Sequence, residues 1–325
     1  MKTPRKILVT GAGGFLGHQL AHHLVMQGHQ VTGADVSFSG LQNPTFERHV
    51  ADVRDRSKMR TALQGVEVVF HLASAHLQTS LDASEYRSVN VDAVRGLLEE
   101  AESCGVLKFI HVSSVAVYGD LASWPADEST ACAPQNIYGA TKLEGEGEVR
   151  RFSERTSFPT VILRPTWVFG ATCPRTRKLY RALRNRSFIM IGNGENLRHP
   201  LYVVDFVEGF EALLEAEVRP ADVFILGGDR PVPTRELVET ICAVYGFRRP
   251  AIGVPMAAGT FAAAAVEGAF RLARREPPIS RRTLEFFNTN NAFNTSKAAQ
   301  ELGFVPRFTL EEGLRDCRAD LEAIA

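Results

Sequence analysis

The sequence has few cysteines and no pairing pattern among them. Its 325 residues include five cysteines, none in a C-x-x-C pair, at positions 104, 132, 173, 242 and 317. This scatter excludes a disulfide framework and a zinc cluster, so we expect no bound metal and the reduced thiols of a cytoplasmic protein. An excess of charge is also missing, since 37 acidic residues balance 37 basic ones. The balance gives no electrostatic reason to expect a nucleic acid or an anionic membrane as a partner.

Long hydrophobic runs are absent as well. The most apolar stretch, Met256 to Phe270, is rich in alanine and contains Glu267, and it is too short and too polar for a transmembrane helix. We interpret it as a helix packed beneath a substrate pocket, with a surface that contacts a membrane or a partner as the alternative. The basic and then apolar N-terminus is interrupted by glycines, which is not the pattern of a signal peptide.

A glycine-rich turn near the N-terminus is the strongest motif. The β-branched run Lys6 to Thr10 predicts a buried parallel strand, and leucines at every fourth position from Leu16 to Leu24 predict a helix after it. Between them, Gly11 allows a tight turn, Gly14 lets a pyrophosphate approach the backbone, and Gly17 lets helix and strand pack closely. Free amides at the N-terminus of such a helix bind phosphate. The motif predicts a dinucleotide site.

An acidic residue follows about 20 residues later, at the usual distance for a dinucleotide fingerprint. The run Gln30 to Ala34 predicts a second strand, and Asp35 ends it. A carboxylate at this place accepts hydrogen bonds from the ribose hydroxyls of an adenosine and repels a 2′-phosphate. Since no Arg or Lys lies between Val36 and Gly40 to offset that repulsion, we expect NAD rather than NADP as the cofactor.

Strands and helices alternate along the chain, which predicts an α/β fold with a Rossmann-type, doubly wound parallel sheet. Further strands are expected at residues 48–50, 66–70, 108–112, 160–163, 201–204 and 224–226, with a hairpin at 189–195. Further helices are expected at 56–63, 83–104, 138–153, 173–186 and 206–216, with Asp205, Thr234 and Thr309 as helix caps. We expect residues 1–170, with 201–228 returning to them, to form the NAD-binding domain. Residues 171–200 and 229–325 are expected to form a smaller, mostly C-terminal substrate-binding region.

Tyr138 and Lys142 lie four residues apart in an expected helix, and therefore on one face of it. An ammonium beside a phenol favours the phenolate. The ordinary tyrosine pKa is about 10, so action as a base near neutrality requires a lowering by about 3 units, or about 4 kcal/mol. Ser113 and Ser114 follow the expected strand at 108–112, where hydroxyls point into the ligand crevice of a parallel sheet. The pattern indicates proton transfer beside a nicotinamide.

Taken together, these motifs resemble the extended short-chain dehydrogenases/reductases, the group that holds nucleotide-sugar epimerases and 3β-hydroxysteroid-type dehydrogenases. The resemblance covers nearly the whole chain. It rests on T-G-x-x-G-x-x-G at Thr10 to Gly17, Asp52-Val53, His71-Leu72-Ala73, Asn90, Ser113-Ser114 ahead of Val117-Tyr118-Gly119, Tyr138-x-x-x-Lys142, Arg164-Pro165, and the tail motifs Ser296-Lys297-Ala298 and Leu302-Gly303-Phe304-x-Pro306.

The resemblance implies a role for each matching residue. Tyr138 is the general base or acid, Lys142 lowers its pKa and holds the nicotinamide ribose, and Ser114 bonds the reacting oxygen, with Ser113 as the near alternative. Asp52 reaches the adenine, although a helix cap before residues 56–63 is an equal interpretation of that residue. The group commonly pairs as homodimers through the helices that contain Asn90 and Tyr138. The implied cofactor-binding residues are Gly11, Gly14, Phe15, Leu16, Gly17, Asp35, Asp52, Val53, Leu72, Ala73, Ser74, Asn90, Tyr138, Lys142 and Pro165.

Departures from the family pattern exclude some reactions of the group and bear on the class of substrate. Members that dehydrate or decarboxylate nucleotide sugars carry an acid between the serine or threonine and the following Tyr-Gly, where this chain has Val115 and Ala116. We therefore expect neither a 4,6-dehydratase nor a decarboxylase. Nucleotide-sugar members tend to place Asn where this chain has Trp167, an indole suited to stacking on a ring or walling an apolar pocket. Arg198 matches an arginine that often binds a diphosphate. Ser113, Ser114, Trp167 and Arg198 are the expected substrate residues.

Three functions are compatible with the sequence. The first is an NAD-dependent oxidoreductase that transfers hydride reversibly at a secondary alcohol or ketone of a sugar-like or other cyclic substrate. The second is an NAD-dependent nucleotide-sugar epimerase that oxidises, rotates and re-reduces its substrate. The third is a non-catalytic protein that senses NAD and binds a partner.

Overall fold

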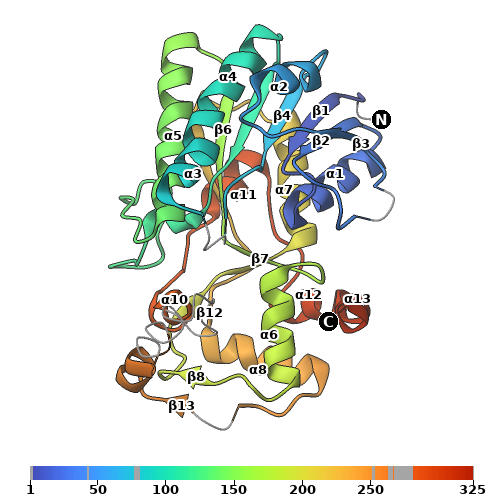
Figure 1. Cartoon of the computed structure of the whole chain (residues 1–325). Coiled ribbons are helices and arrows are strands. Elements are labelled where there is room, and N and C mark those ends of the chain that lie inside the picture. Colours follow the sequence, from blue (N-terminus) through green and yellow to red (C-terminus); the bar gives the residue numbers. More distant parts are fainter. Residues whose placement is uncertain are drawn as a thin grey trace.

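A seven-stranded parallel sheet with helices on both faces forms the centre of the computed structural model (Figure 1), which describes residues 3–41, 44–76, 81–250, 253–262, 266 and 281–324. The strand order is β11-β6-β5-β4-β1-β2-β3. This order is doubly wound and confirms the predicted fold class. The strands are β1 (Lys6–Thr10), β2 (Gln30–Asp35), β3 (Glu47–Val50), β4 (Val68–His71), β5 (Lys108–Val112), β6 (Thr160–Pro165) and β11 (Asp222–Leu226).

Alternate residues of each strand face opposite sides of the sheet and pack against different helices. On one side Ile7 and Val9 share a core with Leu20 of α1 and Phe210 of α7, and on the other side Leu8 belongs to a second core. Both faces are covered, which explains the unbroken apolar runs of the central strands. The helices around the sheet are α1 (Phe15–Met26), α2 (Arg56–Ala62), α3 (Ala83–Arg87), the π-helical turn η1 (Ser88–Asp92), α4 (Ala93–Ser103), the 3-10 turn η2 (Val115–Tyr118), α5 (Ile137–Thr156), α7 (Val203–Glu215) and α11 (Ser296–Leu302).

A second region lies beyond the carboxyl edge of the sheet, at the bottom of Figure 1. It contains β7 (Trp167–Phe169), β8 (Met190–Ile191), β9 (Leu197–Arg198), β10 (Pro200–Tyr202), β12 (Val232–Pro233), β13 (Gly253–Val254), α6 (Pro174–Arg184), α8 (Thr234–Tyr245), α10 (Arg281–Asn288), α12 (Leu310–Asp316) and α13 (Arg318–Ile324). The expected hairpin at 189–195 is wrong, because β8 pairs in parallel with β13 and β9 pairs antiparallel with β12.

The chain then returns to the central sheet through α7 and β11. β11 pairs in parallel with β6. The Lys108 ammonium donates to the carbonyl oxygens of Leu213 and Ala216, each at 2.8 Å, and so satisfies the C-terminal end of α7. These contacts join residues that are far apart in sequence to the strand that precedes the serine pair.

Two of the three expected helix caps are wrong. Asp205 lies inside the first turn of α7, and its buried carboxylate accepts from the backbone amides of Arg307 (2.9 Å) and Phe308 (3.2 Å) instead. Thr234 is the first helical residue of α8 rather than its cap. Thr309 does cap α12, with a capping box. Asp205 therefore ties the C-terminal segment to α7.

Within the part of the chain that the structure describes, no helix combines the length and the apolar character needed to cross a membrane. All five cysteines are unpaired. Of the stretch Met256 to Phe270, residues 256–262 are helical and Met256 packs beside Ile191 and Leu284. Residues 263–265 and 267–270 lie outside the described residues, so their place beneath a pocket stays a prediction.

Candidate active site

The predicted site residues gather at the carboxyl ends of the central strands. β1, β4, β5 and β6 are neighbours in the sheet, so the segments that follow them meet at one edge. These segments carry the glycine-rich turn, residues 72–74, the serine pair and the residues after Pro165. The sheet therefore explains how motifs spread over 150 residues of sequence reach one place.

The glycine-rich turn has the shape of a phosphate cradle. Gly11 has φ of 75°, and a Cβ on it would lie 2.7 Å from the backbone nitrogen of Ala73. A Cβ on Gly17 would lie 2.1 Å from the carbonyl oxygen of Gly11, so no other residue fits there. Gly14 caps α1 without a side-chain hydrogen bond, and the first intrahelical bond runs from His18 N to Gly14 O. The amides of residues 15–17 are therefore available to a pyrophosphate.

Asp35 faces this turn from the end of β2. One carboxylate oxygen accepts from Gly13 N at 2.9 Å, and the other accepts from Ser37 N at 3.1 Å. A Cβ on Gly13 would collide with Ser37 O at 2.1 Å, so the two segments touch. The carboxylate is thus held beside the cradle, where the ribose of an adenosine fits and a 2′-phosphate does not.

Asp52 and Val53 follow β3 on the same edge. The Asp52 carboxylate accepts from the backbone N of Arg54 at 2.9 Å and from its Nη2 at 2.6 Å, and these bonds lower the pKa of Asp52. α2 is capped by Asp55, so the interpretation of Asp52 as the helix cap is wrong. Val53 is buried. An adenine amino group at Asp52 would share the carboxylate with Arg54.

Asn90 lies in a π-helical turn, and its side chain forms hydrogen bonds with the segment that follows β4. The expected single helix at 83–104 is instead α3, η1 and α4, and Asn90 lies in η1. Its Oδ1 accepts from Ala75 N at 2.8 Å, and its Nδ2 donates to Ala75 O (3.1 Å) and Thr141 Oγ1 (2.9 Å). Ala73 N donates to Thr10 Oγ1 at 3.2 Å. Residues 72–75 are therefore fixed between β1 and α5 at both ends.

Ser114 and Tyr138 lie together at the start of α5. The helix is capped by Asn136, whose side chain accepts from Gly139 N at 2.9 Å. Burial raises the pKa of Tyr138, while the charge of Arg175 and hydrogen bonds with Ser114 and Ser74 lower it. Of the two serines, Ser114 is thus the one that meets the phenol.

Ser113 points elsewhere. It is buried, and its hydroxyl donates to the Glu146 carboxylate at 2.6 Å. Its side chain therefore faces the interior between β5 and α5 rather than Tyr138. A substrate role for Ser113, expected beside that of Ser114, would require this buried bond to break.

Lys142 is 1% exposed and sits behind Tyr138. Burial lowers its pKa to about 8, against the opposing charge of Glu146. His71 and His111 are paired across β4 and β5, with ring centroids 5.5 Å apart. Burial, with a smaller effect from Lys142, lowers the pKa of His71 to about 3 and that of His111 well below its ordinary value. Both imidazoles are neutral at neutral pH, so they add no charge beside the ammonium.

Two further residues beside Tyr138 were not singled out from the sequence. The ring of His76 lies 4.3 Å from that of Tyr138, and Arg175 Nη2 lies 3.3 Å from His76 Nε2. Arg175 is the cation among the groups that lower the pKa of Tyr138. It belongs to the basic helix expected at 173–186, and nothing in the sequence separates it from the other cations there.

The two expected substrate residues in the second region have different surroundings. Trp167 is half-buried and packs against Phe169, with ring centroids 6.2 Å apart. Arg198 is buried, donates to Glu285 O at 2.8 Å and lies 4.8 Å over the Phe286 ring. Burial, and then the charge of Arg175, lowers the pKa of Arg198 to about 10. The charge of Arg175 therefore lowers the pKa of both Tyr138 and Arg198.

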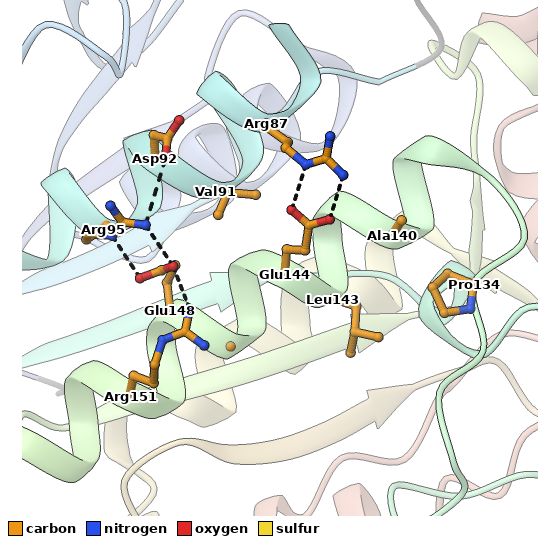
Figure 2. Close-up of a pocket in the computed structure, with 11 residues that line it drawn as sticks. Arg87, Val91, Asp92, Arg95, Pro134, Ala140, Leu143, Glu144, Glu148 and Arg151 are labelled. Atoms are coloured by element: carbon orange, nitrogen blue, oxygen red, sulfur yellow. Dashed lines mark hydrogen bonds and ion pairs between the residues drawn. The ribbon is translucent and has the colours of Figure 1, made fainter. Parts of the chain in front are cut away.

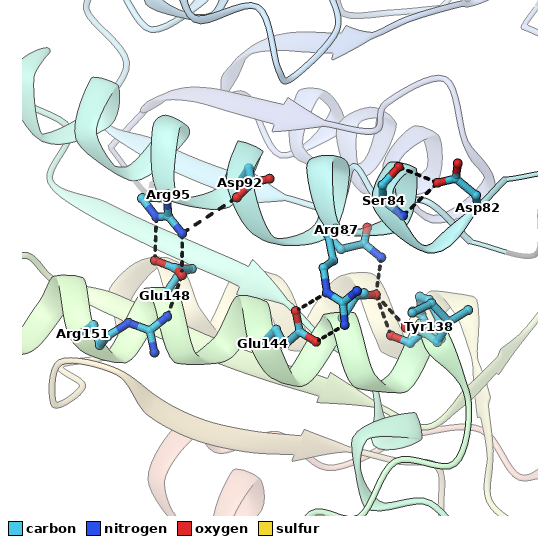
Figure 3. Close-up of polar contacts among 12 residues, drawn as sticks. Asp82, Ser84, Arg87, Asp92, Arg95, Tyr138, Glu144, Glu148 and Arg151 are labelled. Atoms are coloured by element: carbon cyan, nitrogen blue, oxygen red, sulfur yellow. Dashed lines mark hydrogen bonds and ion pairs between the residues drawn. The ribbon is translucent and has the colours of Figure 1, made fainter.

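A surface groove of about 640 Å³ runs between α5 and the continuous helical segment formed by the end of α3, η1 and the start of α4, away from these groups (Figure 2). Ion pairs of Arg87 with Glu144 (3.0 Å) and of Arg95 with Glu148 (2.9 Å) cross it. Figure 3 shows Tyr138 at the beginning of α5 and these carboxylates farther along the same helix. The groove is lined by Arg87, Val91, Asp92, Arg95, Pro134, Ala140, Leu143, Glu144, Gly147, Glu148 and Arg151. No cluster of side chains able to hold a metal is found among the described residues.

Comparison with known proteins agrees with this geometry. Residues 7–227 match the family described as the NAD dependent epimerase/dehydratase family. The 2-alkyl-3-oxoalkanoate reductase of Stenotrophomonas maltophilia (strain K279a) is 30% identical over 98% of this chain and 100% of its own. The N-acetyl-alpha-D-glucosaminyl-diphospho-ditrans,octacis-undecaprenol 4-epimerase of Escherichia coli O157:H7 is 27% identical over 95% of this chain and 92% of its own.

Solved structures share the fold. The UDP-glucuronic acid 4-epimerase from Bacillus cereus, crystallised in complex with NAD, superposes with a TM-score of 0.78 at 23% identity, covering 98% of this chain and 99% of that one. The similarity extends over both the central sheet and the second region, because almost the whole of each chain is aligned.

Proposed function

Because the chain belongs to the NAD dependent epimerase/dehydratase family, within the extended short-chain dehydrogenases/reductases, we propose that it exchanges a hydride between NAD and a secondary alcohol or ketone with Tyr138, Ser114 and Lys142 as its catalytic groups. It is an NAD-dependent enzyme, so the non-catalytic alternative is set aside. The observation that carries the proposal is Tyr138 hydrogen-bonded to Ser114 and placed one helical turn before a buried lysine. The cradle at Gly11 to Gly17 and the Asp35 carboxylate fit the cofactor.

Tyr138 moves the proton in this reaction. Because burial raises the pKa of the phenol, the resting enzyme keeps the proton on Tyr138, ready for a ketone that becomes an alcohol. In the opposite direction Tyr138 must be a phenolate before its oxygen can receive the hydroxyl proton of the alcohol, and this needs a lowered pKa. Ser114, Ser74 and the Arg175 charge act in that direction. The bound nicotinamide supplies the hydride acceptor or donor.

The substrate we propose is a sugar-like or other cyclic alcohol. Trp167 offers an indole face to such a ring. A nucleotide-sugar epimerase is the second candidate, and the observation that favours it is a pair of cations, the buried Arg198 and Arg175, whose charge lowers the pKa of Arg198. Two cations that act on one site suit a diphosphate. The relatives include both types, a reductase and sugar epimerases.

The nucleotide content of freshly purified protein tests these two candidates. An epimerase returns its hydride to the same substrate and can hold NAD permanently, whereas a net dehydrogenase must release the cofactor in every cycle. Denaturation followed by mass and absorbance measurement of the released nucleotide is expected to give far less than one NAD per chain. Near-stoichiometric NAD would contradict the dehydrogenase and favour the epimerase. Failure of the protein to bind added NAD would contradict both.

We also propose a homodimer in the cytoplasm, paired through the groove between η1, which contains Asn90, and α5, which contains Tyr138. Support comes from the size of the groove, from apolar residues such as Leu143 among the ion pairs, and from five free thiols. Residues 1–170 with 201–228 are proposed to bind NAD, and residues 171–200 with 229–325 to bind the substrate.

The variant Gly147→Trp tests the pairing. A Cβ at Gly147 would have the end of the Arg151 side chain as its nearest neighbour, at 3.2 Å, and this flexible end can move. We therefore expect the single chain to tolerate the substitution and a partner in the groove not to. Sedimentation is expected to give a dimer for the wild type and for the control Ala299→Trp, at an exposed position of α11, and a monomer for Gly147→Trp. A dimer in all three proteins would place the interface elsewhere.

A further inference from the structure

A fully buried ion pair lies one helical turn behind the proposed catalytic lysine. Glu146 on α5 has an exposure of 0% and Arg164 on β6 has 2%. Arg164 donates to the two Glu146 oxygens from Nε at 2.9 Å and from Nη2 at 2.6 Å. This two-pronged geometry fixes the angle between carboxylate and guanidinium as well as their distance.

The hydrogen-bonding capacity of the carboxylate is nearly saturated. Besides Arg164, Ser113 Oγ donates to Glu146 at 2.6 Å and Arg150 Nη2 donates at 3.2 Å. A buried ion pair is costly to form and is weak support for stability by itself. The many hydrogen bonds of the Glu146 carboxylate are therefore better explained by an effect on the position and charge of neighbouring residues than by a contribution to stability.

Arg164 is also linked by hydrogen bonds to the segment that precedes α5. Arg164 Nη1 donates to Tyr118 Oη at 2.7 Å, and Tyr118 Oη donates to Asp127 O at 2.9 Å. Asp127 belongs to the segment between η2 and α5. One continuous set of hydrogen bonds thus runs from the catalytic helix through β6 to this segment.

Lys142 faces few charges. Among the described groups, Glu146 is the acid that acts on it from α5, while His71 from β4 and His111 from β5 are neutral. Arg164 forms a buried ion pair with Glu146 at 2.6 Å, and the partly exposed Arg150 forms a second pair with the same carboxylate at 3.2 Å. The net field at Lys142 therefore depends on the balance between the Glu146 carboxylate and these two arginines, of which Arg164 is the buried one.

We propose that Glu146 and Arg164 form a positioning pair that sets the charge of Lys142 and directs Ser113 away from the cleft, leaving Ser114 to meet the reacting oxygen. Neither residue touches the reacting atoms. The pair acts through Lys142 and the serine pair, and the inference rests on the proposed role of Lys142 in hydride transfer. Its test needs no turnover, so the two proposals can fail separately.

The test reads the protonation of Lys142 from stability. The free energy of unfolding is measured against pH for the wild type and for each variant, each paired with the same protein carrying Lys142→Met. The difference within a pair isolates Lys142. In the wild type this difference is expected to be constant at low pH and to start changing near pH 8, where folded Lys142 begins to lose its proton. We call the pH at which it starts to change the break.

Opposite shifts are expected for the two halves of the pair. Glu146→Gln leaves Arg164 uncompensated and moves the break to lower pH by about one unit or more. Arg164→Met leaves Glu146 with the partly exposed Arg150 as its remaining ion-pair partner, and moves the break to higher pH by a smaller amount. The variant carrying both substitutions is expected to break near the wild-type pH, and it replaces any single variant that fails to fold. A merely structural pair would lower stability without moving the break. Breaks that stay in place, or that move in the same direction, would overturn the proposal.

Discussion

Replacing Tyr138 by Phe is expected to lower kcat at least about a hundredfold, the usual contribution of a positioned acid or base. The substitution removes one oxygen and keeps the ring that packs 4.3 Å from His76, so the start of α5 should not move. The residues proposed to bind NAD, at the glycine-rich turn and at Asp35, are untouched. The measurement is the turnover of any alcohol that the wild type oxidises, together with the dissociation constant of NAD from calorimetry.

A second tyrosine provides the control for this substitution. Tyr245 lies on α8 and its hydroxyl donates to Leu314 O at 3.1 Å, far from the serine pair in the fold. Tyr245→Phe removes the same atom and should retain turnover. An unchanged kcat in Tyr138→Phe would contradict the assignment of Tyr138 as the general acid and base. A large loss of NAD affinity would instead show that Tyr138 mainly holds the cofactor.

Replacing Lys142 by Met is expected to stabilise the fold while abolishing turnover. Lys142 is 1% exposed, and its pKa falls from 10.5 to about 8 on folding. Because each pKa unit is worth 1.36 kcal/mol, the buried ammonium costs about 3 kcal/mol at neutral pH. Met fills a similar volume without the charge, so the free energy of unfolding should rise by an amount of that order. Chemical denaturation at pH 7 measures it.

The sign of the pH dependence gives this prediction a second readout. Between pH 8 and 10.5 the unfolded chain still holds the lysine proton and the folded chain has begun to lose it, so raising the pH stabilises the wild type. The advantage of Lys142→Met should therefore be full below pH 8 and vanish above pH 10.5. An advantage that is constant across this range would mean that packing, not charge, is responsible.

The central sheet could be predicted from the sequence because its strands are short apolar runs bounded by glycine or polar residues. Lys6–Thr10 and Lys108–Val112 have the expected bounds. Parallel strands buried on both faces show this signal strongly, and their ends then place the attached motifs. The position of Ser114 and Tyr138 at one edge follows from that alone.

Features that depend on distant partners could not be predicted. The segment 189–195 looks like a hairpin, yet its strand pairs with Gly253–Val254. Asp205 stands where the sequence predicts a helix cap, but its carboxylate accepts hydrogen bonds from the backbone amides of Arg307 and Phe308. The π-helical turn at Asn90 leaves no mark in the apolar periodicity, which continues through α4.

The same limit applies to the candidate site. Arg175 and His76 meet at Tyr138 only after the second region folds beside the sheet, and the local sequence of neither residue indicates that contact. The commitment of Ser113 to Glu146 likewise depends on the register between β5 and α5. Sequence motifs predicted which residue types would be catalytic, and that assignment stays a prediction. The charges around those residues depend on the three-dimensional arrangement and could not be predicted.

The strand order has a consequence for synthesis on the ribosome. β6 lies between β5 and β11, and every one of its residues is buried in the finished sheet. Its final neighbour begins only at Asp222, so the nascent chain must add 56 residues, 166 to 221, before that side of β6 can pair. At about 5–20 residues per second, this delay lasts several seconds. During that time an apolar strand edge is open to other nascent chains, and this interval is when the protein should depend most on chaperones to avoid aggregation.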